Sequence, residues 1–164
     1  MSHRRARQQT DKLLTVLHEA ELPFVVVGGV AAIAHGAATS TKDLDIVIPM
    51  TPEHLRHLMN VLEPFHPMHA HRHDLGVITN TPEELARFRL LLIDTQLGRL
   101  DVLKTVEPIG HYDQLQSVKM ELIEGRTFSV LDQLIAIKAH IGRRKDLIVE
   151  QELRAIRAMR SKKD

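Results

Sequence analysis

The stretch FVVVGGVAAIAHGAATSTKDLDIVI, residues 24–48, joins a glycine pair to an acidic pair. It opens with four apolar residues that favour β-structure and indicate a short strand ending at Gly28-Gly29. The Ala-rich residues 30–35 favour a helix, and residues 44–48 favour a second strand. The stretch therefore predicts the order strand, glycine turn, helix and strand.

The glycine pair is the first candidate for chemistry. Gly28 and Gly29 have no side chains, so their backbone can come close to a bound group. A helix that begins after them would direct free N–H groups and the positive end of its dipole to the same place. A phosphate group fits there, and a simple tight turn is the alternative explanation of the same two residues.

The acidic pair, Asp43 and Asp45, is the second candidate. Residues two apart on a strand point the same way, so the two carboxylates share one face while Leu44, Ile46 and Ile48 share the other. Neighbouring carboxylates repel each other unless a cation lies between them. Mg²⁺ prefers one or two carboxylates together with phosphate oxygens. The alternative is a pair of solvated acids near the start of a strand.

Three further features stand later in the chain. Asp101 is an acid inside the apolar run Leu100-Asp101-Val102, where Arg99 on the same face could form a simple ion pair with it. Lys138 continues the apolar stripe of the expected helix over 131–141, so it either reaches a phosphate or extends to solvent along its aliphatic stem. The run Gly142-Arg143-Arg144-Lys145-Asp146, with Asp146 as a helix cap, is by itself typical of a solvated surface.

Composition limits the classes of protein and site. The chain has 164 residues, of which 43 % are hydrophobic and 26 % charged, so one globular domain over residues 1–164 is expected. The absence of cysteine excludes disulfides, zinc-thiolate sites and thiol nucleophiles. The net charge of +1 neither requires nor excludes a nucleic-acid partner. No apolar run reaches the ~18 residues of a membrane span, and a cytoplasmic protein is expected.

The remaining chain predicts helices and strands in alternation. Helix starts are expected at Thr51-Pro52 and Thr81-Pro82, because Thr caps a helix and Pro suits its first turn. We expect an α/β (α+β) fold, with a mixed sheet flanked by helices in about 22–130 and a helical C-terminal extension in about 131–160. The expected elements are a helix near 9–20, helices from 52 and from 82, strands at 89–93 and 100–103, a hairpin over 116–130, and helices over 131–141 and 146–159.

Taken together, the two motifs resemble those of the DNA polymerase β-like nucleotidyltransferase superfamily. Thirteen residues separate Gly29 from Asp43, a spacing found in that superfamily between a glycine motif and an acidic pair. The resemblance implies that Gly28 and Gly29 hold the triphosphate of an NTP, and that Asp43 and Asp45 bind Mg²⁺ or Mn²⁺. Asp101 matches the position of the third carboxylate, which completes the metal site or takes the proton of the acceptor.

The C-terminal features are similar to the AbiEii-type toxin branch of the superfamily. That branch has a lysine on a helix followed by an Arg-x-x-Lys-Asp turn, which Lys138, Arg143 and Lys145-Asp146 match in order. Lys138 and Lys145 would then contact the nucleotide, and Asp146 would support the site. This branch often carries an arginine before the acidic pair, where Thr39 stands here, and the departure bears on triphosphate affinity and on the choice of nucleotide.

The implied reaction transfers a nucleoside monophosphate from an NTP to a hydroxyl of RNA or of a protein, with an antitoxin as a further partner. A small-molecule, antibiotic-modifying transferase and a degenerate domain without catalysis are the alternatives. A macromolecular acceptor is favoured by the basic stripe of the last expected helix, Arg154, Arg157 and Arg160, since such a stripe could contact phosphates. The histidines between His66 and His73 could bind zinc, but no regular element is expected to orient them, so a surface loop without a metal is predicted.

Overall fold

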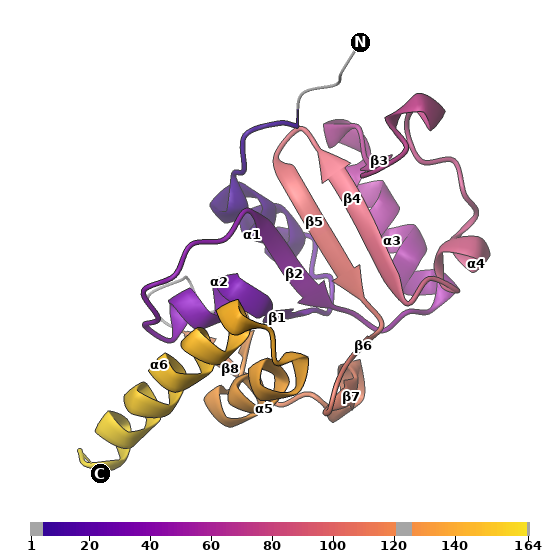
Figure 1. Cartoon of the computed structure of the whole chain (residues 1–164). Coiled ribbons are helices and arrows are strands. Elements are labelled where there is room, and N and C mark those ends of the chain that lie inside the picture. The colour runs from indigo at the N-terminus through magenta and orange to yellow at the C-terminus, as the bar shows by residue number, and fades with distance from the viewer. Residues whose placement is uncertain (1–4, 121–125, 164) are drawn as a thin grey trace.

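A mixed β-sheet forms the centre of the computed structural model, which describes residues 5–120 and 126–163 (Figure 1). Within those residues seven strands form this sheet. In order across it, they are β3 (Met68–His69), β4 (Leu90–Thr95), β5 (Gly98–Leu103), β2 (Asp43–Val47), β1 (Val25–Val27), β9 (Arg126–Ser129) and β8 (Ser117–Met120). A separate ladder pairs β6 (Thr105–Val106) with β7 (Gly110–His111).

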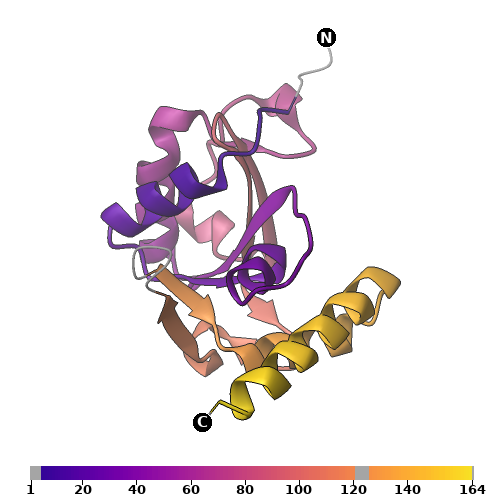
Figure 2. The same cartoon turned by 90° about the vertical axis from the view of Figure 1, so that its left-hand side faces the viewer.

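Helices cover both faces of the sheet. They are α1 (Thr10–Glu19), α2 (Gly28–Ala34), α3 (Pro52–Leu62), α4 (Pro82–Leu85), α5 (Leu131–Ile141) and α6 (Arg144–Ser161), with 3₁₀ turns at Glu63–Phe65, His73–Leu75 and Tyr112–Gln114. Figure 2 shows α1 and α3 on one side of the sheet and α6 on the other. Along the described chain, no helix has both the length and the apolar character that a membrane crossing requires.

The middle of the sheet contains both antiparallel and parallel strand pairs. β2 runs antiparallel to β1 and parallel to β5, and β5 runs antiparallel to β4. Alternation along each strand then divides the side chains between the faces. Leu44 and Ile46 of β2 are fully buried on one face with Leu100 and Val102 of β5, in the core that α1 and α3 help to close. The residues between them lie on the opposite face, where the polar groups gather.

The predicted fold class is confirmed, with a mixed sheet flanked by helices and two helices at its C-terminal side. Both predicted helix starts are confirmed as well, because Thr51 accepts a hydrogen bond from the N–H of His54 and Thr81 accepts one from Glu84. The turn predicted at Glu124-Gly125 lies outside the described residues.

Some element boundaries differ from the predictions. The helix expected from residue 30 begins at Gly28, because the glycine turn is itself the first turn of α2. The segment 64–76, expected to be irregular, contains β3 and two 3₁₀ turns. Asp146 does not cap α6, since Arg143 is the cap residue and Asp146 is the third residue of the helix.

Candidate active site

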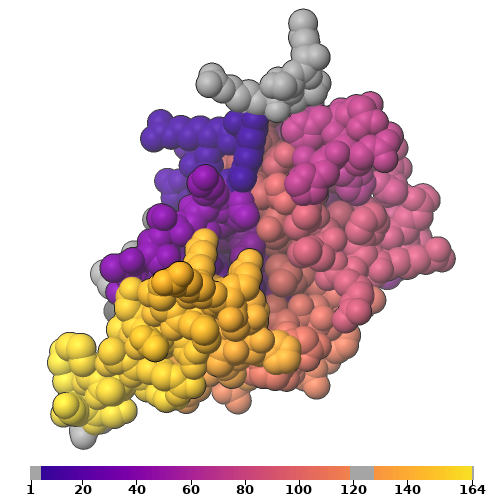
Figure 3. Space-filling model, in the orientation of Figure 1, coloured from indigo at the N-terminus to yellow at the C-terminus, as the bar shows by residue number. Residues whose placement is uncertain are grey.

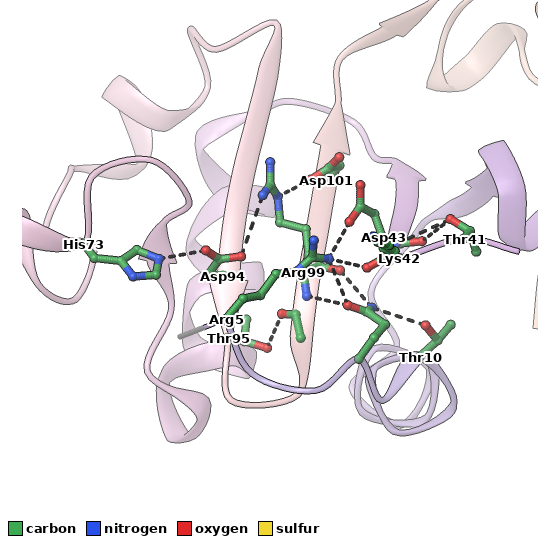
Figure 4. Close-up of polar contacts among 12 residues, drawn as sticks. Arg5, Thr10, Thr41, Lys42, Asp43, His73, Asp94, Thr95, Arg99 and Asp101 are labelled. Atoms are coloured by element: carbon green, nitrogen blue, oxygen red, sulfur yellow. Dashed lines mark hydrogen bonds and ion pairs between the residues drawn. The ribbon is translucent and has the colours of Figure 1, made fainter. Parts of the chain in front are cut away.

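Three carboxylates lie on one face of the two central strands. Asp45 of β2 is the direct partner of Asp101 of β5 in the parallel ladder, and Asp43 is the partner of Arg99. Cross-strand partners place their Cβ atoms roughly 5 Å apart. The predicted shared face of Asp43 and Asp45 is therefore present. Asp101 from a strand 50 residues later joins it, and Figure 4 shows Asp43 and Asp101 on the two strands.

The glycine pair packs directly against this face. Val27, the last residue of β1, is the register partner of Asp45, so the turn begins beside that carboxylate. Gly28 has a φ of +68°, which disfavours other residues, and a Cβ there would collide with the Asp45 carboxylate. A Cβ on Gly29 would lie 2.8 Å from the Cβ of Thr41. Both positions therefore require glycine for the backbone to approach the acidic face.

The acids perturb each other. Burial, followed by the charges of Asp101 and Asp43, raises the pKa of Asp45 to about 7. Burial also raises the pKa of Asp101, and Arg99 opposes this rise. Burial and neighbouring like charges both favour the neutral form of a carboxylate, and this is the electrostatic property expected of a cation site.

Two arginines hold the outer carboxylates of this face. The Arg5 guanidinium contacts both the Asp43 carboxylate and the Lys42 carbonyl oxygen. Arg99 donates from Nε to Oδ1 of Asp101 at 2.8 Å. Within the described residues, no three His, Cys, Asp or Glu side chains converge at a point where they could already hold a metal ion. Binding a metal through all three acids would therefore require Arg5 and Arg99 to release their partners.

Lys138, Arg143 and Lys145 from the C-terminal helices form a cationic wall that faces the acids. Lys138 of α5 has only 9 % of its side chain exposed and contacts Asp146 Oδ1 at 3.3 Å, so the alternative that this lysine extends to solvent is wrong. Arg143 reaches Oδ2 of the same carboxylate at 2.6 Å. Burial alone would raise the pKa of Asp146, but the hydrogen bonds from Arg143 and Lys138 lower it overall. Asp146 therefore stays ionised and orients the side chains of Lys138 and Arg143.

The acids and the cationic wall enclose a cavity of about 170 Å³, here called the site cavity. Its lining residues are Gly29, Thr39, Ser40, Thr41, Asp43, Asp45, Lys138, Arg143, Lys145, Asp146 and Val149. Of the residues predicted from the sequence, Gly28 and Asp101 stand outside this lining but contact its edge through Asp45. A larger hollow of about 410 Å³ beside Met50, at the far end of β2, contains none of the predicted residues.

Sequence reasoning missed a polar chain that leads away from Asp101. His73 Nε2 lies 2.7 Å from Asp94 Oδ2, and Arg99 lies between Asp94 and Asp101 (Figure 4). The segment of His73 was predicted to be a surface loop, whereas the structure fixes this histidine against β4. The strand predicted at 89–93 stopped one residue short of Asp94. Extending that strand by one residue would have included Asp94, which lies on the same face as Asp101.

Each arginine of the predicted basic stripe of α6 contacts a partner within the chain, and two of the three partners are carboxylates. Arg154 pairs with Glu150 at 2.8 Å, and Arg157 pairs with Asp132 at 3.1 Å. Arg160 donates to the carbonyl oxygen of His35. In Figure 3 the yellow C-terminal end of α6 lies at the lower left of the molecule. The expected stripe of free cations beside the site is therefore absent among these three arginines.

His35 joins α2, β9 and α6. Its Nε2 lies 2.8 Å from the Ser129 carbonyl oxygen, and Arg160 donates to its Nδ1 at 3.2 Å. These contacts fix a neutral ring that donates from Nε2 and accepts at Nδ1. Burial, with a smaller contribution from the charge of Arg160, lowers the pKa of His35, although the bond to Ser129 opposes this. The histidine therefore anchors α6 only while it is neutral.

Comparisons with known proteins give structural likeness alone. No protein-family model matches the chain, and no curated protein matches it. The crystal structure of ANT(2")-Ia in complex with adenylyl-2"-tobramycin is 14 % identical, with a TM-score of 0.47 over 88 % of this chain and 94 % of that one. The solution structure of the antibiotic-resistance factor ANT(2'')-Ia is 15 % identical, with a TM-score of 0.46 over 92 % and 91 %. At these values neither an activity nor a substrate is transferred to this protein.

Proposed function

We propose that this protein is a nucleotidyltransferase, which moves a nucleoside monophosphate from an NTP to an acceptor hydroxyl. The observation that supports this most is the register of β2 with β5, because it sets Asp45 beside Asp101 and next to the glycine turn. Lys138 and Lys145 line the same cavity as Asp43 and Asp45. A complex of a metal ion with a triphosphate requires carboxylates for the metal and cations for the phosphates, and both line this cavity.

The acidic face fits a divalent metal ion such as Mg²⁺ or Mn²⁺. Asp43, Asp45 and Asp101 would hold it, and the pKa of Asp45 is raised because this carboxylate is buried beside two other acids, whose charge a cation would offset. When bound, the metal ion would neutralise charge on the phosphates and align the attacking and leaving oxygens. Arg5 and Arg99 would exchange their carboxylates for other partners, and phosphate oxygens are the natural ones for a guanidinium.

The other residues of the cavity bind and orient the phosphates. Lys138 is fixed in direction by Asp146, so it presents a point charge without the entropy cost of ordering a free lysine. Lys145 and Arg143 add charge at the rim. In the transfer, the acceptor oxygen loses its proton to a carboxylate such as Asp101 and forms a bond to the α-phosphorus. The bond from that phosphorus to the pyrophosphate oxygen breaks, and pyrophosphate leaves.

A small-molecule acceptor fits the structure better than RNA does. An RNA acceptor was expected on account of the basic stripe, whose arginines are paired within the chain. A toxin that modifies RNA or a protein, with an antitoxin as partner, is the second candidate function. Salt-dependent RNA binding would favour it, because each phosphate contact adds about one to the slope of log affinity against log salt.

The test is calorimetric binding of each NTP with and without Mg²⁺, followed by transfer from an α-labelled NTP. The double variant Asp43→Asn with Asp45→Asn should lose metal-dependent binding, and Asp11→Asn on the exposed surface of α1 serves as the control. NTP binding that needs no metal and survives in the double variant would instead identify a binding domain without catalysis. No NTP binding under any condition would overturn the proposal.

A further inference from the structure

A second pocket opens on the face that carries the acids, on the side of β4. In the antiparallel ladder Leu92 of β4 is the direct partner of Asp101, and Leu90 is the partner of Leu103. Leu92 and Asp101 therefore lie side by side on one face, with Cβ atoms roughly 5 Å apart. We call this hollow of about 380 Å³, which Leu90 and Leu92 help to line, the edge pocket.

The edge pocket has apolar walls that the core does not cover. Leu75, Phe88 and Leu90 line it, and all three belong to the large hydrophobic side chains that are exposed in this structure. Figure 3 looks onto this face, where the magenta-to-pink segment stands beside the strands. A contiguous exposed apolar patch of this kind is typical of an interaction or ligand site. Its volume suits a small molecule.

One wall of the edge pocket is preformed. The ring of His69 stacks on Phe88 with centroids 5.8 Å apart and planes inclined by 22°. His69 Nε2 lies 2.7 Å from Asn80 Oδ1, which fixes the direction of the ring. Asn80 in turn donates to Glu84 of α4 at 2.9 Å. A flat ligand would meet an ordered aromatic wall, so little conformational entropy would be lost there on binding.

The charges of the residues that line the edge pocket disfavour a polycationic ligand. Of the lining residues that the structure describes, none is acidic. Arg72 is the one permanent cation among them, and it pairs with Asp74 at 3.0 Å. An ammonium group at the end of the pocket away from Asp101 would lose water, and the nearby carboxylates of Asp74 and Glu84 are already bonded to Arg72 and Asn80, so burial of its charge would be costly. A neutral apolar body would lose nothing comparable.

We propose that the edge pocket is the acceptor subsite, and that the acceptor is a small alcohol or phenol with a flat, uncharged apolar body. This rests on the nucleotidyl transfer proposed above. The apolar body lies over Leu90 and Leu92 against Phe88, and the hydroxyl points toward Asp101. The hydroxyl gives its proton to that carboxylate, its oxygen bonds to the α-phosphorus, and pyrophosphate departs.

The proposal is tested with 2-naphthylmethanol as the probe, observed by ligand NMR on the full chain. Leu90→Ser should weaken probe binding by about fivefold or more, because part of a leucine contact is removed. Leu147→Ser is the matched control, since Leu147 on α6 is exposed to a similar degree, 44 % against 48 % for Leu90. The control should leave probe affinity within about twofold of wild type. Equal affinity in all three proteins would overturn the proposal.

Two further measurements separate this proposal from the proposed function. A probe that carries an aminomethyl group at the far end of the ring should bind more weakly, and tighter binding would contradict the assigned chemistry. With Mn²⁺ and ATP bound, the hydroxymethyl protons of the probe should broaden, because the pocket adjoins Asp101. Bound Mn²⁺-ATP without broadening would overturn the acceptor role alone. Absence of Mn²⁺-ATP binding, with the probe still bound, would overturn the nucleotidyl transfer and the acceptor role with it.

Discussion

Replacing Asp45 with Asn should stabilise the metal-free protein at alkaline pH. The pKa of Asp45 rises from 3.8 to about 7 on folding, so the ionised carboxylate opposes folding. At about 1.4 kcal/mol for each pKa unit, the rise corresponds to an upper limit of about 4 kcal/mol, and to about half of that if Asp101 shares the charge. The amide of Asn resembles the protonated acid and can still donate to Asp101.

The stability gained by Asp45→Asn depends on pH, and the direction of this dependence follows from the raised pKa of Asp45. An acid with a raised folded pKa has no effect on stability below its unfolded pKa near 3.8. Its cost grows as the pH rises and is complete above about 7. Asp45→Asn should therefore match wild type near pH 4 and exceed it at pH 8, when unfolding by urea is followed in the presence of a chelator.

A control and a metal titration make the test decisive. Asp43→Asn removes a carboxylate that is already paired with Arg5 at the surface, so it should change the unfolding free energy by no more than about 1 kcal/mol. Added Mg²⁺ and NTP should stabilise wild type, by about 2.7 kcal/mol at a hundred times the dissociation constant, but not the Asp45 variant. A variant that shows no gain at pH 8 and keeps metal-dependent transfer would refute the assignment of Asp45.

Three further predictions concern the surroundings of the acids. Lys138→Met should lower the free energy of unfolding in urea by about 3 kcal/mol and weaken NTP binding, because it leaves the buried Asp146 carboxylate with one exposed partner. The control Lys145→Met, at the rim of the site cavity, should be near wild type in stability. Equal losses of stability in both variants would contradict the role of Lys138 as the buried partner of Asp146. His35→Gln should reduce the loss of thermal stability that wild type shows between pH 7.5 and pH 5. A histidine whose pKa is lowered by folding destabilises the folded protein once the pH falls below about 6.5. Parallel plots of melting temperature against pH for wild type and variant would refute this prediction. Gly28→Ala should cost about 2 kcal/mol or more, through its positive φ and its collision with the acidic face. Gly142→Ala, in the left-handed region with a φ of +67° and no atom nearer than 3.6 Å to the added Cβ, should cost only about 1 kcal/mol. Equal melting temperatures for the two variants would show that the collision is absent.

Local sequence was enough to predict most of the elements. The alternation Asp43-Leu44-Asp45-Ile46 gave both the strand and the face of each side chain, because the pleat assigns faces by parity alone. Threonine and proline marked the starts of α3 and α4, because capping is a contact between near neighbours in sequence. These predictions required no knowledge of how distant segments meet.

The partners of the site residues could not be predicted in this way. The pairing of β2 with β5 is a long-range register, and only the resemblance had linked Asp101 to the acidic pair. The contact of Arg5 with Asp43 spans 37 intervening residues, and nothing in the basic run near the N-terminus indicates it. The opposite error occurred on α6, where charges at helical spacing were interpreted as free although each had a partner.

The order in which the chain is synthesised matters for this arrangement of charge. Asp43, Asp45 and Asp101 are all made before Lys138, the fixed cation that the folded structure sets against them. At about 5–20 residues per second, the ribosome needs several seconds to make the chain between Asp101 and Asp146. During that interval Arg5 and Arg99 could already pair with Asp43 and Asp101, but the charge of Lys138, which favours ionised Asp45, would still be missing. Binding of cellular magnesium, or packing of α5 and α6 against the sheet, would then determine when β2 and β5 pair.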